Sequence, residues 1–376
     1  MSGPAINLLD LTLPELTAWM RTELGEPAFR ATQVWQWLWQ KLARDFGDMS
    51  NVSMACRARL AERAFIGWPE VRFVQKSRDG TTKLLLRLRD GALVETVLIP
   101  SDSREGARRW TQCLSCQVGC AMGCTFCATG QAGFERNMRM GEILGQVLVA
   151  RAHLGDGRPD HPVLRNLVFM GMGEPLLNLE EVLRALQCLN SDKGLNFSPR
   201  RVTVSTCGLE RGLPELGQSG LCYLAVSLHA PSQDLREKIM PGAARWPLPA
   251  LIEALRAYPL KTRERITLEY LLINGVNDSP LHARQLARLV GELRGKLNLI
   301  VYNPVEGLPY TAPEPERVLA FERCLWKRRV TAVVRKSRGQ DINAACGQLK
   351  AGLAHGGYAE EGPSIPNSPG AGHSRE

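Results

Sequence analysis

The hydrophobic pattern of the chain changes near residue 108, where short apolar runs begin to alternate with longer amphipathic stretches. A short apolar run predicts a buried strand, whereas an apolar stripe at helical spacing predicts a helix. Repeated strand–helix units indicate a parallel sheet, and six or seven units fit a complete or an incomplete barrel. The strands that we predict read WTQCLS, NLVFMGM, RVTVST, YLAVSL, RITLEYLL, NLIVYN and VTAVVR. We therefore expect an α/β barrel domain over residues 106–350, with its chemistry at the carboxyl ends of the strands.

Residues 1–70 have a helical pattern and predict an accessory domain. Thr12 is a suitable N-cap, with Pro14 in the first turn of the helix that follows. Trp35 and Trp39 share one face of a second helix. Such a pair could stack on bases, but packing in a core is the interpretation we favour.

Two further segments flank the predicted barrel. Residues 71–105 contain two Asp-Gly turns between alternating segments, a pattern that predicts a small antiparallel β-hairpin or meander, and we expect this segment to link the two domains. Residues 351–376 are rich in Gly, Pro and Ser, and we expect them to be disordered.

The charge of the chain favours a polyanionic partner. Lys and Arg number 47 against 38 Asp and Glu, giving a net charge of +9. The stretch WKRRVTAVVRKSRG, residues 326–339, carries basic residues and no acidic one, which is typical of a surface that contacts RNA or DNA. We see neither a signal peptide nor an apolar run long enough to cross a membrane, so we expect a cytoplasmic protein without membrane contact.

The stretch CQVGCAMGCTFC, residues 116–127, has the highest density of candidate metal-ligating cysteines in the sequence. Cys120, Cys124 and Cys127 give the spacing Cys-x3-Cys-x2-Cys directly after the first predicted strand. Closely spaced thiolates suit zinc or an iron–sulfur cluster. A structural zinc site needs four ligands, and Cys116 could be the fourth, but a second Cys-x2-Cys pair is missing. Three cysteines with Phe126 before the third are typical of the [4Fe-4S] site of radical S-adenosylmethionine (SAM) enzymes.

Other predicted strands end in small polar residues. Gly173 and Glu174 follow the second strand, and a carboxylate there could accept a hydrogen bond from the ammonium group of SAM. The later strands end in Ser205, then Ser227 and His229, then Asn303. Each alone could be a structural cap, but together they predict a ring of polar groups at one end of the barrel.

These motifs resemble the radical SAM methyl synthases, the family that contains the RlmN and Cfr enzymes. The resemblance rests on CQVGCAMGCTFCATGQAGFERNM, MGMGEPLLN, VTVSTCGL, VSLHAPS and DINAACGQLK, and covers residues 95–350. It implies a partial (β/α)6 radical SAM barrel with an RNA-binding helical domain. It also implies methylation of adenosine C2 in 23S rRNA, and in tRNA beside the anticodon. Leu228 joins Ser227 and His229 among the implied SAM contacts.

The resemblance also implies a mechanism with two SAM molecules per turnover. The first methylates the Cys346 thiolate, a displacement on a soft nucleophile. The second yields a 5′-deoxyadenosyl radical that takes hydrogen from this methyl group, and the methylene radical then adds to C2. Glu95 matches the base that removes the C2 proton. Cys113 matches the cysteine that releases the RNA by forming a disulfide with Cys346.

Two alternatives stay open on the sequence. The first is a Cfr-like C8 methyltransferase of 23S rRNA, and the second is a zinc-stabilised RNA-binding protein without catalysis. Cys116 departs from the family pattern, where we expect serine, and could be a bystander or a competing thiol. We expect a monomer that receives electrons from a donor such as flavodoxin or ferredoxin.

Overall fold

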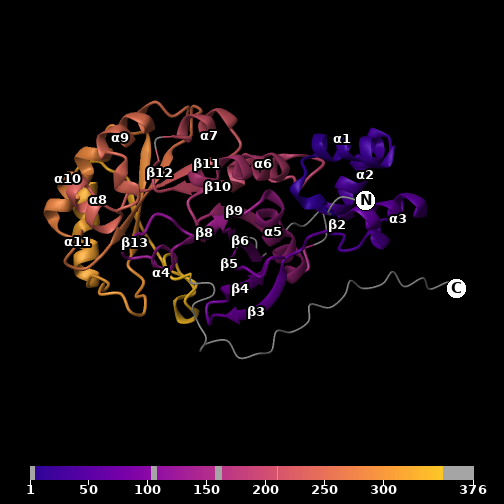
Figure 1. The fold of residues 1–376 in the computed structure, drawn as a ribbon. Coiled ribbons are helices and arrows are strands. Elements are labelled where there is room, and N and C mark those ends of the chain that lie inside the picture. The colour runs from indigo at the N-terminus through magenta and orange to yellow at the C-terminus, as the bar shows by residue number, and fades with distance from the viewer. Residues whose placement is uncertain (1–4, 103–107, 157–162, 210, 350–376) are drawn as a thin grey trace.

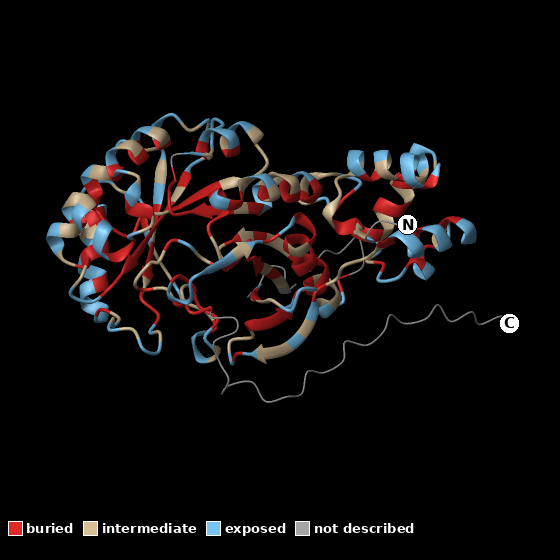
Figure 2. Cartoon of the chain, in the orientation of Figure 1, coloured by how far each residue is buried: buried red, intermediate tan, exposed pale blue. Residues whose placement is uncertain are grey.

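The computed structural model describes residues 5–102, 108–156, 163–209 and 211–349 (Figure 1). The tail that we predicted to be disordered, 351–376, lies outside the described residues. A ten-stranded sheet runs through the molecule in the order β14-β13-β12-β11-β10-β9-β6-β5-β4-β3. Its central strands are mostly buried, the edge strand β3 is partly exposed, and the helices around the sheet expose their outer faces (Figure 2).

The parallel part of this sheet contains every strand that the apolar runs predicted. Neighbouring strands pair in parallel from β6 to β14. These strands are β6 (Arg108–Cys113), β9 (Leu164–Phe169), β10 (Val202–Thr206), β11 (Tyr223–Ser227), β12 (Ile266–Leu272), β13 (Gly295–Val301) and β14 (Ala332–Arg335).

Helices connect the parallel strands and cover the outer face of the sheet (Figure 1). Within the described residues β14 pairs with β13 alone, so the curved sheet does not close. The predicted partial (β/α)6 barrel is therefore confirmed, with six strand–helix units followed by β14. The helices are α5 (Met140–Leu154), α6 (Leu179–Asn190), α7 (Leu213–Ser219), α8 (Gln233–Ile239), α9 (Leu248–Arg256), α10 (Pro280–Val290) and α11 (Pro315–Trp326).

The segment predicted as a separate hairpin or linker is continuous with the barrel sheet. It forms an antiparallel meander of β3 (Glu70–Lys76), β4 (Thr82–Arg87) and β5 (Leu93–Asp102). Strand β5 then pairs antiparallel with β6, with Val97 opposite Cys113. Since Val97 and its neighbours are buried, the meander shares the barrel's core instead of standing apart from it.

The N-terminal helices form a lobe at one end of the molecule, beside α5 and α6 (Figure 1). They are α1 (Leu13–Leu24), α2 (Ala28–Trp39) and α3 (Met54–Arg63), and the strands β1 (Ile6–Asn7) and β2 (Ala64–Phe65) join their ends. Glu15 Oε2 accepts hydrogen bonds from the backbone N–H (2.7 Å) and hydroxyl (2.8 Å) of Thr12, so the predicted cap is present. Trp35 and Trp39 are buried and meet edge to face at 5.5 Å, which confirms core packing.

No helix among the described residues is both long and apolar enough to cross a bilayer.

Candidate active site

The three clustered cysteines lie on the loop that connects β7 (Gln117–Gly119) to α4 (Ala128–Ala132). The short strand β7 pairs with β8 (Phe134–Asn137). Gly119 has a φ of +76°, and a Cβ there would lie 2.1 Å from the carbonyl oxygen of Gly133. Only glycine fits this close approach of the two strands.

A cavity of about 160 Å³ brings the cysteines together with most of the predicted polar ring. It opens at the carboxyl ends of the parallel strands, where the fold class places its chemistry. Its lining includes Cys120, Cys124, Cys127, Gly173, Glu174, Ser205, Ser227, His229, Glu269 and Cys346.

The donors of this cavity fit an iron–sulfur cluster, whose irons take cysteine thiolates as ligands. Burial raises the pKa of all three thiols, so a bound cation is needed to hold them as thiolates. Among the described residues, no three His, Cys, Asp or Glu side chains converge closely enough to hold one metal ion. A cluster of several irons spreads its cysteine ligands around a larger group.

Glu174 is fixed at the cavity wall by neighbouring strands. Its Oε1 accepts hydrogen bonds from the Thr206 hydroxyl (2.6 Å) and the Leu176 N–H (3.0 Å), and its Oε2 accepts from the Cys207 N–H (2.8 Å). Gly173 has a φ of +104°, and a Cβ there would lie 2.6 Å from Gln117 Cβ. The Gly-Glu pair therefore lets the chain turn tightly beside β7 while keeping a buried carboxylate oriented.

His229 is held as a neutral ring beside the cysteine loop. Its Nδ1 accepts a hydrogen bond from the Leu271 N–H at 3.1 Å, and its ring meets Phe126 edge to face at 5.2 Å. Burial, aided by the charge of Arg236, lowers the pKa of His229 to about 3. The neighbouring Leu228 is not a lining residue, because its side chain is fully buried in the core.

Glu269 is a residue of this cavity that the sequence reasoning missed. It sits inside β12, in the run RITLEYLL, where we interpreted every position as part of a buried strand. The side chain is buried, and its Oε1 accepts no hydrogen bond from the described residues. The Nη1 of Arg335 lies 4.0 Å from that oxygen. A charged residue within an apolar strand was the available signal, because burying a carboxylate is costly unless it has a partner.

Cys346 borders two cavities. The second cavity, of about 80 Å³, is lined by Cys113, Asn303 and Cys346, together with the basic side chains of Arg335, Lys336 and Arg338. Cys346 is solvent-exposed through the opening, yet the protein around its thiol still raises its pKa. The Nδ2 of Asn303 donates to the carbonyl oxygen of Cys346 at 3.3 Å. The structure therefore brings Asn303 to Cys346 and away from the polar ring of the first cavity.

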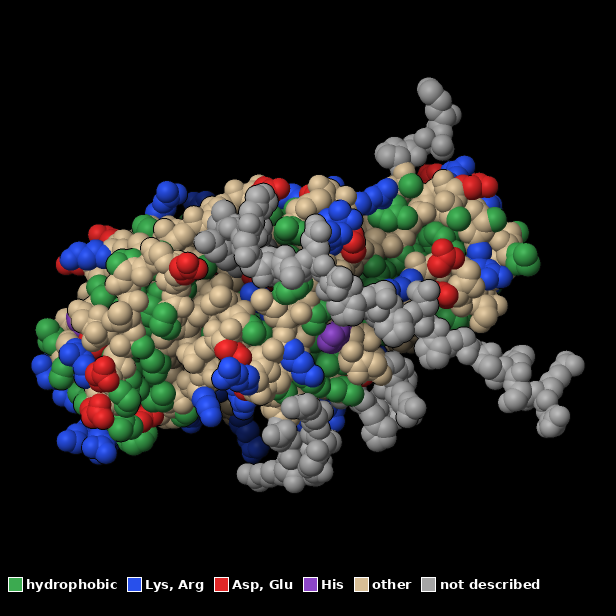
Figure 3. Space-filling view, turned by 90° about the horizontal axis from the view of Figure 1, so that it is seen from below, with side chains coloured by type: hydrophobic (Ala, Val, Ile, Leu, Met, Phe, Trp, Pro, Cys, Tyr) green, Lys and Arg blue, Asp and Glu red, His purple; other side chains and the backbone are tan. Residues whose placement is uncertain are grey.

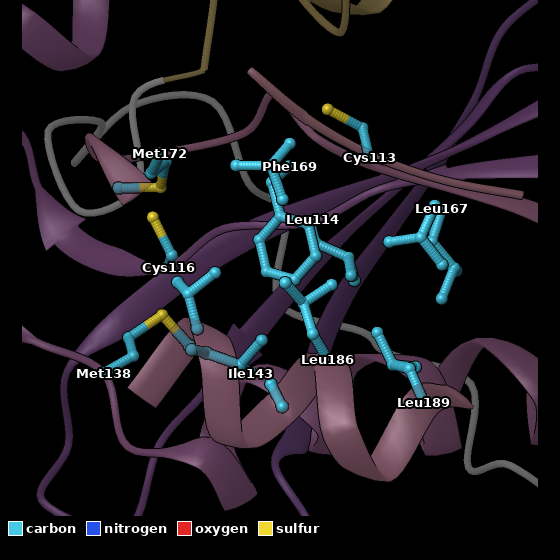
Figure 4. Packing of buried hydrophobic residues seen from close by; sticks show 14 of the residues in the cluster. Cys113, Leu114, Cys116, Met138, Ile143, Leu167, Phe169, Met172, Leu186 and Leu189 are labelled. Atoms are coloured by element: carbon cyan, nitrogen blue, oxygen red, sulfur yellow. The ribbon is translucent and has the colours of Figure 1, made fainter. Parts of the chain in front are cut away.

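The fold separates Cys113 from Cys116. Cys113 lies at the end of β6 and lines the cavity that it shares with Cys346. Cys116 lines neither of these two cavities and packs among apolar side chains beside Met138 and Met172 (Figure 4). Cys116 is therefore placed as a core residue, and of the two only Cys113 shares a cavity with Cys346.

Glu95 is buried on β5 rather than facing solvent. Its Oε1 forms an ion pair with Lys83 Nζ at 3.0 Å. The sheet register puts Val97 opposite Cys113, and Glu95 is two residues from Val97 on the same face of β5. Ile99, on the same face of β5, lines the second cavity, whereas Glu95 does not.

Comparisons with known proteins agree with this geometry. The family model for the ribosomal RNA large subunit methyltransferase N-terminal domain matches residues 6–66, and the radical SAM superfamily model matches residues 114–287. The crystal structure of a radical SAM methyltransferase from Sphaerobacter thermophilus has a TM-score of 0.84 at 44% identity, covering 92% of this chain and 99% of that one. The fold and the site therefore define a radical SAM methyltransferase.

The particular family follows from sequence relatives. The dual-specificity RNA methyltransferase RlmN of Nitratidesulfovibrio vulgaris strain Hildenborough is 71% identical over 362 residues, which cover 96% of this chain and 100% of that protein. The protein of the same name from Syntrophus aciditrophicus is 44% identical, covering 92% and 96%. This chain belongs to the RlmN family and is a radical SAM RNA methyltransferase. Membership implies a [4Fe-4S] cluster and SAM, and it overturns the alternative of a non-catalytic RNA-binding protein.

Proposed function

We propose that this enzyme methylates C2 of adenosine in 23S rRNA and in tRNA, and that the methyl group passes through Cys346. The observation that carries the proposal is the position of Cys346 between two cavities. One contains the three cysteines that would hold the cluster, and the other contains Cys113. Cys346 can therefore receive a methyl group on one side and meet a second thiol on the other.

Residues of the first cavity would hold the cofactors. Cys120, Cys124 and Cys127 would hold the cluster, which when bound supplies the electron for reductive cleavage of SAM. Contacts to SAM are assigned to Gly173, Glu174, Ser205, Ser227 and His229, which all line this cavity. Glu269 joins this set because its buried Oε1, which accepts no hydrogen bond from the described residues, is an acceptor for a hydroxyl or ammonium donor of SAM.

The chain's own residues would carry out the transfer and release. The Cys346 thiolate attacks the methyl carbon of a first SAM molecule, breaks the C–S⁺ bond and leaves S-adenosylhomocysteine. A second SAM supplies the radical chemistry, so two are used per turnover. Once Cys346 is tethered to the base, Glu95 takes the C2 proton. The Cys113 thiolate then attacks the Cys346 sulfur and forms a disulfide, while the electron pair of the broken S–CH₂ bond goes to the carbon, which takes up a proton and becomes the methyl group on C2.

Basic side chains at the mouth of the second cavity suit the RNA partner. Arg335, Lys336 and Arg338 line that cavity beside Cys346, which supports a role for them in contacting phosphates next to the target base. The open edge at β14 leaves this end of the barrel accessible to a large substrate. Electrons would come from a donor such as flavodoxin or ferredoxin.

The test is a reaction with a transcribed 23S rRNA fragment and a tRNA, using anaerobically reconstituted enzyme and methyl-deuterated SAM. We expect deuterated 2-methyladenosine in both digested RNAs and a methyl group on the peptide that contains Cys346. A methyl group at C8 would instead identify the Cfr-like activity. Product formation by enzyme whose Cys346 never carries a methyl group would rule out the intermediate.

A further inference from the structure

The segment that carries Cys346 is anchored from three directions. The cluster loop contributes the Ala128 N–H, which donates to the Gly347 carbonyl at 2.8 Å, and the Thr129 hydroxyl, which donates to the Leu349 carbonyl at 2.7 Å. The end of β13 contributes the carbonyl of Pro304, which accepts from Gln348 Nε2 at 2.7 Å. These two anchors belong to the barrel itself.

The third anchor is the turn between β3 and β4, in the meander before the barrel. The Ser77 hydroxyl and the Arg78 N–H donate to the two carboxylate oxygens of Asp341, at 2.6 and 3.2 Å. The Gly339 N–H donates to Asp79 Oδ2 at 3.0 Å. Although partial burial opposes it, hydrogen bonds from Thr81 and Gly339 lower the pKa of Asp79 to about 2. Residues about 260 positions apart are thus joined by charge-assisted hydrogen bonds.

Lys83 connects the Cys346 segment to Glu95, the proposed base. Its side chain is 6% exposed, and its Nζ lies 3.0 Å from Glu95 Oε1 and 3.4 Å from the Asn343 carbonyl oxygen. One buried ammonium group therefore contacts both Glu95 and the backbone three residues before Cys346. A buried charge in this position needs both partners, because leaving it unpaired is costly.

We propose that the β3–β4 turn, residues 77–81, together with Lys83 at the start of β4, is a positioning element of the active site. It fixes the Cys346 segment between the two cavities and, through Lys83, sets that segment relative to Glu95. The chemical part of this inference rests on the proposed role of Cys346. Ser77, Asp79 and Lys83 act as positioning residues, because their contacts are with the segment and with Glu95 and not with the reacting atoms.

The experiment compares the full-length, cluster-loaded enzyme with three variants. Asp341→Ala removes the acceptors of Ser77 and Arg78 at the surface, and Lys83→Met removes the buried ammonium group. Glu70→Gln is the matched control, because it lies on the same hairpin and pairs with the exposed side chains of Arg72 and Arg87. Hydrogen exchange of residues 339–349 is measured in the resting enzyme. The rates of methyl-Cys346 formation and of RNA adduct release are measured separately.

We expect Asp341→Ala to accelerate exchange in this segment about tenfold, since it removes hydrogen bonds to a charged group. Methyl-Cys346 should form about tenfold more slowly, with cluster content unchanged. Lys83→Met should also slow adduct release, whereas Glu70→Gln should behave as wild type. Faster exchange with unchanged chemistry, or unchanged exchange in Asp341→Ala, would overturn the proposal. If wild-type Cys346 is never methylated, the proposed function fails instead, and the exchange result still decides whether the turn anchors the segment.

Discussion

Cys113 and Cys116 are three positions apart, yet only one of them reaches the second cavity. Cys113 is the last residue of β6, so its direction is set by the sheet and by its neighbour Val97. After it the chain leaves the sheet, and the backbone of Cys116 is held by the Met172 carbonyl, which accepts its N–H at 2.9 Å. The spacing of the cysteines predicted which three share a loop. It could not predict the direction of Cys116, because that depends on contacts with residues far along the chain.

The separation of these two thiols predicts opposite results for their alanine variants. Cys113→Ala should methylate Cys346 and then accumulate protein crosslinked to RNA, because a distant thiol cannot reach the Cys346 sulfur. The crosslink is measured as a nuclease-sensitive shift on a denaturing gel. Cys116→Ala is the control and should release methylated RNA at close to the wild-type rate. A crosslink in Cys116→Ala but not in Cys113→Ala would reverse the two roles, and one in neither would contradict the tethered mechanism.

Glu269 gives a second prediction for a single residue. Glu269→Gln keeps the shape of the side chain but removes the charge of an acceptor that has no other hydrogen-bond partner at Oε1 among the described residues. We expect SAM to bind about tenfold more weakly, the effect of losing a hydrogen bond to a charged group. Binding is measured by calorimetry on enzyme of verified iron content. Glu322→Gln, a buried carboxylate outside the cavity, is the control. Equal SAM affinity in both variants would remove Glu269 from the set of SAM contacts.

At the scale of elements, the alternation of apolar runs and helices was enough to predict every parallel strand of the ten-stranded sheet, although not the short parallel pair of β1 and β2 in the N-terminal lobe. The two Asp-Gly turns likewise predicted the meander, since the turns fall between β3 and β4 and between β4 and β5. The pairing of β5 with β6 was not predictable in this way. This pairing joins the meander to the barrel, on either side of residues 103–107. No turn motif or hydrophobic periodicity in the sequence specifies which strand will pair with the edge strand of the meander.

The basic run that we expected to contact RNA is divided by β14. Arg329 lines a pocket at the start of the strands, whereas Arg335, Lys336 and Arg338 line the cavity of Cys346 at the other end of β14. Lys and Arg side chains also occur in separate groups, with acidic side chains between them, on the face shown in Figure 3. The net charge therefore does not by itself locate the RNA.

This division changes the expected effect of removing charge. Replacing Lys336 and Arg338 by Gln should flatten the dependence of log affinity on log salt concentration, by roughly 0.7 to 0.9 for each phosphate that the protein no longer neutralises. The comparison is the pair Lys327→Gln and Arg328→Gln, which precedes β14 and should change the slope less. Affinity for a tRNA is measured across a series of salt concentrations. A larger change from the Lys327 and Arg328 pair would place the RNA on the opposite end of the barrel.

At the scale of the molecule, the sequence predicted a helical N-terminal lobe and a barrel but not how they meet. The lobe is attached to α5 and α6 by contacts between residues far apart in the chain. Asp10 Oδ1 accepts the Gly141 N–H at 3.0 Å, and Gln40 Nε2 donates to the Asp192 carbonyl at 2.9 Å. Such polar contacts follow no periodic pattern, so propensity and hydrophobic spacing do not reveal them.

Arg184 of α6 is the main polar link in this attachment, and it allows the role of the lobe to be tested. Its Nη2 donates to the Asp10 carbonyl and to Glu15 Oε2, both at 2.7 Å, and its Nη1 donates to Glu181 at 2.8 Å. Arg184→Ala should loosen the lobe from the barrel while leaving both cavities intact, because Arg184 lines neither.

We therefore expect Arg184→Ala to lower kcat/KM for RNA methylation about tenfold, with little change in the rate of methyl-Cys346 formation. We propose that the first quantity depends on RNA held across the lobe and the barrel, whereas the second needs only SAM and the barrel. A tenfold loss corresponds to about 1.4 kcal/mol, within the range for hydrogen bonds that involve a charged group. Arg63→Ala is the control, since Arg63 pairs with Glu23 inside the lobe and both side chains are exposed. If Arg184→Ala slows both reactions equally, the lobe supports the fold of the barrel and does not guide the RNA.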